Sequence, residues 1–147
     1  MTALRTLLTI ALLLPGAALA QAPAPPDLDC SAGFEGLRSA AAALPGAQAG
    51  KDDRFDVVTV LAPDTWKVDF AFTRAGQAAH PAVTLRTFHK QVTGVWTAQS
   101  KGCSFGDSRQ FAALMADMKE RDSELTNASR AEVDRKKQDA SPLAPAP

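Results

Sequence analysis

The residues that could carry out chemistry are few, and the first to consider surround a serine. Residues 102–106, Gly-Cys-Ser-Phe-Gly, match the Gly-x-Ser-x-Gly pattern of a nucleophile elbow and fall between an expected strand and an expected helix. In hydrolases with this elbow the catalytic histidine follows the serine, whereas His80 and His89 both precede Ser104. We therefore interpret the glycines as turn formers. The alternative hypothesis is that the protein is a small hydrolase or thiol enzyme that uses Ser104 or Cys103 with His89.

The two cysteines of the chain, Cys30 and Cys103, predict a disulfide and not a reactive thiol. A thiolate–imidazole pair would need a free Cys103 near His89. The start of the chain has the pattern of an export signal, and disulfides persist in exported proteins. Because the bridge would close a long loop, the chain-entropy treatment gives it about 4 kcal/mol of stabilisation.

The spacing of the other polar residues indicates no metal, cofactor or acid–base site. His80, His89 and the cysteines show none of the short spacings of zinc sites. The adjacent carboxylates Asp52 and Asp53 fall in an expected loop, where Asp is common because it forms turns. We predict no catalytic residue, no metal site and no cofactor.

The first twenty residues contain the three parts of a secretion signal in order. Arg5 supplies a positive start, residues 7–14 form an apolar run, and Ala18-Leu-Ala20 is a cleavage site before Gln21. The apolar run is shorter than the roughly 20 residues that span a bilayer. We predict a signal peptide over residues 1–20 and a periplasmic or secreted protein with no stable membrane insertion after cleavage.

Composition and proline content divide the remainder of the chain. The whole chain carries 16 basic and 16 acidic residues, which balance, so no nucleic-acid partner is predicted. The Ala/Pro-rich residues 21–29 and 138–147 predict a linker and a disordered tail. Between them, residues 30–137 are long enough for a single disulfide-bridged α+β domain with a partly solvated C-terminal helix.

The spacing of apolar residues within that domain predicts a helix, four strands and a second helix. Helical spacing runs over residues 34–44, and the second helix begins after Asp107 or Ser108. Period-two or continuous apolar runs mark four strands: 55–61, 66–73, 82–92 and 95–100. We expect an α+β two-layer sandwich of four antiparallel strands with both helices on one sheet face, the one that carries Trp66 and Phe70.

The opposite face of that sheet is the candidate binding surface. If Trp66 points into the core, several polar and charged residues share the other side of the strands. A mixed-charge sheet face can bind a partner or only face solvent. An exposed Trp96 would be its best contact hot spot. The predicted face comprises Lys67, Asp69, Thr73, Arg86, Lys90 and Trp96.

Our leading hypothesis is an exported small non-enzymatic binding or interaction protein. Its ligand is unidentified, either a protein or a small molecule. A homodimer is a further option, because residues 55–61 are apolar on both alternating sides. The motifs of the chain identify no family.

Overall fold

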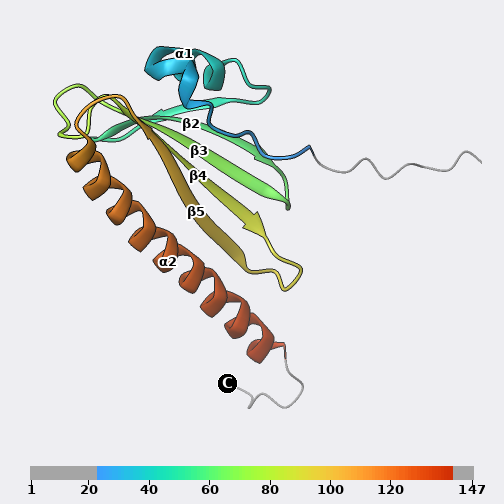
Figure 1. Ribbon diagram of the computed structural model, residues 1–147. Helices are drawn as coiled ribbons and strands as arrows, with labels where there is room; N and C mark the ends of the chain where they lie inside the picture. The colour runs from blue at the N-terminus through green and yellow to red at the C-terminus, as the bar shows by residue number, and fades with distance from the viewer. Residues whose placement is uncertain (1–22, 141–147) are drawn as a thin grey trace, which may run out of the picture.

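The computed structural model describes residues 23–140 (Figure 1). The signal peptide expected over residues 1–20 lies outside these residues, as do residues 141–147 of the expected tail. Within residues 23–140 no helix combines the length and apolarity that a membrane crossing requires.

The centre of the fold is a five-stranded antiparallel sheet whose strand order follows the chain (Figure 1). The α+β class with antiparallel strands is confirmed, but the expected number of four strands is wrong. The additional strand is β1, an edge strand that pairs with β2 alone and is exposed at all four residues. Because β1 has no buried side, its residues Gln-Ala-Gly-Lys carry no apolar alternation. The strands are β1 (Gln48–Lys51), β2 (Phe55–Ala62), β3 (Trp66–Thr73), β4 (Ala82–Lys90) and β5 (Trp96–Ser104).

The two main helices, α1 (Gly33–Ala42) and α2 (Ser108–Asp139), lie on opposite faces of the sheet. Leu37 and Ala41 of α1 belong to the core cluster that contains Trp66, Val68, Phe70 and Phe72. Leu114 of α2 packs in a second cluster with Phe55, Ala71 and Ala82. Alternate residues of β3 point to opposite sides, so the two clusters lie on opposite faces. Figure 1 shows α1 and α2 on either side of the strands.

The expectation of both helices on the Trp66/Phe70 face is therefore wrong. Beyond Asp69, β3 is buried at every position, including Ala71 and Thr73. These small side chains give a weak apolar signal, although they support a second core. We call the side that carries α1 the α1 face, and the opposite side the α2 face.

A disulfide joins Cys30 to Cys103, as predicted, with 5.6 Å between the Cα atoms. Cys30 begins a short 3₁₀ helix, η1 (Cys30–Ala32), which leads into α1. Cys103 is buried near the end of β5. The bond therefore attaches the start of the N-terminal helical segment to the sheet on the α1 face.

The residues before η1 also contact the α1 face, as the blue segment of Figure 1 shows. The Trp66 indole Nε1 donates a hydrogen bond to the carbonyl oxygen of Pro23, at 2.6 Å. Asp27 forms an ion pair with Lys101 of β5. The described part of the expected linker, residues 23–29, thus lies against the sheet and does not extend away from it.

Candidate functional site

The six residues predicted to form a binding face lie on one side of the sheet, the α2 face. Strand register places Asp69 opposite Arg86 and Lys90 opposite Trp96. Directly opposed residues in an antiparallel pair point to the same side. Helix α2 nevertheless crosses this side over β5, so the six residues fall into covered and open sets.

Arg86 belongs to the covered set, where it anchors α2. Its Nε atom donates to Oδ1 of Asp122 at 2.7 Å, and the two side chains are only 16% and 9% exposed. The hydroxyl of Ser100 donates to the same carboxylate oxygen at 2.8 Å. Because a buried charge needs compensating partners, this network is structural.

The Thr73 hydroxyl is also committed to the fold, and the Trp96 backbone is bonded to α2. The Thr73 hydroxyl accepts a hydrogen bond from the Ala82 amide at 2.8 Å and donates to the Ala82 carbonyl at 3.0 Å. Trp96 is half-buried, and its backbone amide donates to the hydroxyl of Ser129 at 2.8 Å. Of the other predicted residues, Lys67 is 42% exposed, Lys90 34% and Asp69 22%.

Lys67 and Asp69 lie in the part of the α2 face that α2 leaves uncovered. The Lys67 ammonium is 2.9 Å from Asp69 Oδ2, and the Thr59 hydroxyl donates to Asp69 Oδ1 at 2.6 Å. Lys67 also lies over the ring of Phe88, 5.1 Å from its centroid. We call this region the open half-face; it comprises Val57, Thr59, Leu61, Lys67, Asp69 and Phe88.

Lys90 lies at the margin of the open half-face. Its ammonium contacts Asp64 Oδ1 at 2.8 Å, next to the β2–β3 turn. The hydrogen bond from Lys90 holds the pKa of Asp64 below its ordinary value. Both partners are solvated, so the pair adds little rigidity.

The residues of the alternative enzyme hypothesis do not come together. Cys103 is in the disulfide, and His89 pairs with Thr97 while Ser104 pairs with Ala82. His89 therefore lies seven positions along β4 from Ala82, the partner of Ser104, a distance of about 23 Å along the strand. The alternation of β4 also places His89 on the α1 face and Ser104 on the α2 face.

The glycines of the Gly-x-Ser-x-Gly string permit close packing. A Cβ atom on Gly102 would lie 2.7 Å from the carbonyl oxygen of Val83, and one on Gly106 would lie 2.8 Å from that of His80. Neither glycine has a positive φ. The missing side chains therefore allow the neighbouring backbone to approach closely, and the glycines do not supply the turn conformation that we expected.

His80, which the sequence did not indicate as a site residue, lies in a polar cleft of about 630 Å³. Its Nδ1 atom is 2.8 Å from the Thr73 carbonyl oxygen. A carbonyl oxygen only accepts, so Nδ1 donates. Beside it, Arg38 bonds to Asp56 at 3.2 Å, and Arg74 approaches the same carboxylate at 3.8 Å. Glu35, 3.9 Å from Arg38 Nε, adds a second negative charge, so the two acidic side chains balance the two guanidiniums. These residues come from segments far apart in the sequence, so the sequence gave no signal of the cleft.

The described residues contain no group of three His, Cys, Asp or Glu side chains that could hold a metal ion. Comparison with known proteins finds no matching family model, curated protein or solved structure. The chemistry of the α2 face is therefore inferred from its own geometry.

Proposed function

We propose that this protein is an exported, non-enzymatic interaction module that binds a partner protein through its open half-face. The observation that carries the proposal is the exposed Leu61, 49% accessible, beside a fixed polar network on an uncovered sheet surface. Apolar and aromatic groups within a polar surround are typical of the core of a protein interface.

The open half-face is suited to a protein partner because its polar groups are already ordered. Asp69 is held from two sides, by Lys67 and by Thr59. Binding then loses less side-chain entropy than it would with freely rotating groups. Leu61 and the half-buried Phe88 lie on either side of Lys67 and supply apolar contact area.

Export to the periplasm or the extracellular space is supported by the disulfide and by the signal pattern of residues 1–20. A non-enzymatic role is supported by the distance between His89 and Ser104 and by the oxidised state of Cys103. The mass of the exported protein provides the check: we expect a chain that begins at Gln21 and contains no free thiol.

The binding proposal is tested by site-specific photo-crosslinking in the exported fraction. A crosslinker at position 61 should capture a partner protein, whereas one at position 99, exposed on the α1 face, should not. The partner is then identified by mass and purified. Its affinity should fall at least tenfold for Leu61→Asp, since a buried carboxylate without a partner is costly.

Four results would overturn the proposal. Equal capture from positions 61 and 99 would show that the open half-face has no special role, and so would unchanged affinity of Leu61→Asp. Capture of a second copy of the chain would favour the homodimer. Catalytic turnover that disappears in a single-residue variant would support the alternative of an enzyme.

A further inference from the structure

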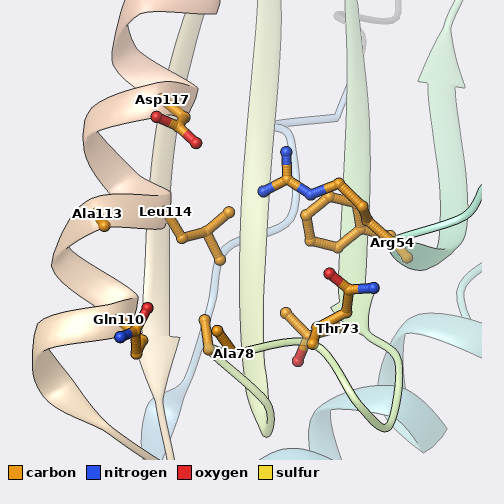
Figure 2. A pocket seen from close by; sticks show the side chains of 10 residues that line it. Arg54, Thr73, Ala78, Gln110, Ala113, Leu114 and Asp117 are labelled. Atoms are coloured by element: carbon orange, nitrogen blue, oxygen red, sulfur yellow. The ribbon is translucent and has the colours of Figure 1, made fainter.

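A separate cavity of about 140 Å³ opens on the α2 face, where the first half of α2 passes the start of β2 and the loop after β3. Figure 2 shows side chains from these three segments around one opening. The open half-face lies further along β2, so this cavity is a second site whose existence does not depend on the proposed partner protein.

The floor of the cavity is apolar and well packed. Phe55, Ala79 and Leu114 line it, and each is more than 90% buried. They belong to the smaller core cluster between the sheet and α2. The floor therefore has a fixed shape that favours a compact apolar group.

The rim carries two opposite charges, those of Arg54 and Asp117. Arg54, the residue before β2, lies over the ring of Phe55, 5.2 Å from its centroid. Figure 2 shows its guanidinium and the carboxylate of Asp117 on α2 pointing toward one another above Leu114. Among the described residues, neither side chain enters an ion pair or a hydrogen bond, whereas Arg86 and Asp122 on the same face form a contact of 2.7 Å.

We propose that this cavity binds a small free α-amino acid with an aliphatic side chain. The ligand carboxylate pairs with the Arg54 guanidinium, a planar group that can hold both carboxylate oxygens. The ligand ammonium pairs with Asp117. The aliphatic side chain occupies the floor between Phe55 and Leu114, and the amides of Gln77 and Gln110 lie at the same opening.

Charge and size together select this ligand class. A simple carboxylate would leave Asp117 without a cation, and a simple amine would leave Arg54 without an anion. A cavity of about 150 Å³ holds a molecule the size of benzene. The side chain of valine or leucine therefore fits, whereas an indole does not.

The first test is calorimetric titration of the mature, disulfide-bonded protein with L-valine and L-leucine. We expect at least one to bind, and isovalerate and isobutylamine to bind at least about tenfold more weakly, because each lacks one charged group. L-Tryptophan should bind as weakly as these analogues. No heat from valine or leucine at about 10 mM, or equal binding of isovalerate, would overturn the proposal.

Variants of the two rim charges provide the second test. Arg54→Gln and Asp117→Asn should each weaken the amino acid at least about tenfold. Lys51→Gln and Glu120→Gln are the matched controls, since they remove nearby exposed charges that do not line the cavity, and they should bind as the wild type does. Equal affinity of all four variants would overturn the site. Leu61→Asp should not change amino-acid binding, so failure here is distinguishable from failure of the protein-partner proposal.

Discussion

The helices on the two faces of the sheet are attached by different kinds of interaction. Helix α1 has ten residues and is held by a covalent bond at its start and by an apolar core. Helix α2 has 32 residues, and beyond Met118 its inward contacts are largely polar. The comparison shows that helix length does not indicate how a helix is attached. The short α1 depends on tertiary contacts, because isolated helices of this length are marginal in water.

The polar contacts of α2 fix its position along β5. Asp122, Thr126 and Ser129 contact Ser100, Ala98 and Trp96 in turn. Three or four residues of a helix span about 4.5–6 Å along its axis, and two residues of a strand span about 6.7 Å. Successive turns of α2 therefore meet every second residue of β5.

The hydroxyls of Thr126 and Ser129 also accept hydrogen bonds from backbone amides at the outer edge of β5. This edge is thereby closed to strand pairing, while β1 remains an exposed edge.

The largest expected effect comes from removing the covalent attachment of α1. Cys30→Ala combined with Cys103→Ala should lower the free energy of unfolding by about 4 kcal/mol, because the bridge spans 73 positions and restricts the unfolded chain. Urea denaturation without reductant measures this. Dithiothreitol should destabilise the wild type similarly and leave the double variant unchanged. A loss below about 1 kcal/mol would show that the apolar core alone holds α1.

The next largest effect should come from the ion pair beneath α2. Asp122→Asn leaves the buried Arg86 without a counter-charge, so we expect a loss of about 3 kcal/mol. Glu120→Gln, at an exposed position of the same helix, is the control and should change stability by less than about 0.5 kcal/mol. Equal effects of the two variants would mean that α2 is held by its apolar first half and not by Asp122.

A smaller effect should follow loss of the two edge hydroxyls. Thr126→Val and Ser129→Ala should each cost about 1 kcal/mol, because an edge amide of β5 loses its acceptor. Native-state hydrogen exchange should show faster exchange at the amides of Ala98 and Trp96. Ser123→Ala is the control, since that hydroxyl bonds only to the Lys119 carbonyl within α2. Unchanged exchange at both amides would contradict the proposed closure of this edge.

The smallest effect concerns the ion pair of Asp27 on the α1 face. The hydrogen bond from Lys101 lowers the pKa of Asp27 below its ordinary value of 3.8. Its contribution is therefore complete above about pH 4 and is lost as the pH falls through the lower folded-state pKa. Both groups are exposed, so the contribution stays below about 1 kcal/mol.

Fluorescence of Trp66 in a Trp96→Phe background measures this change, since the Trp66 indole bonds to Pro23 in the same segment. We expect a transition below about pH 4 that disappears in Lys101→Gln. Lys90→Gln, which removes the partner of Asp64, is the control and should keep the transition. A transition that persists in Lys101→Gln would exclude the Asp27 ion pair as its cause.

Local patterns in the sequence were sufficient for several features of the fold. Asp107 caps α2, with its side chain accepting from the Gln110 amide at 2.8 Å. The alternation of Trp66, Val68, Phe70 and Phe72 identified β3 and its apolar side. The two cysteines predicted their own pairing, since no third cysteine competes. Each depends on neighbouring residues or on a residue type whose partner is unambiguous.

Tertiary structure decided the remaining features, because they depend on which segments meet in space. Small residues such as Ala71 and Ala82 formed a second core, which placed α2 opposite α1. That placement buried Arg86 under Asp122 and left Lys67 and Asp69 in the open. It also brought Arg54 to face Asp117. Charge type and strand alternation place a residue on a face, but only the path of the covering helix determines whether that face is buried or free to bind.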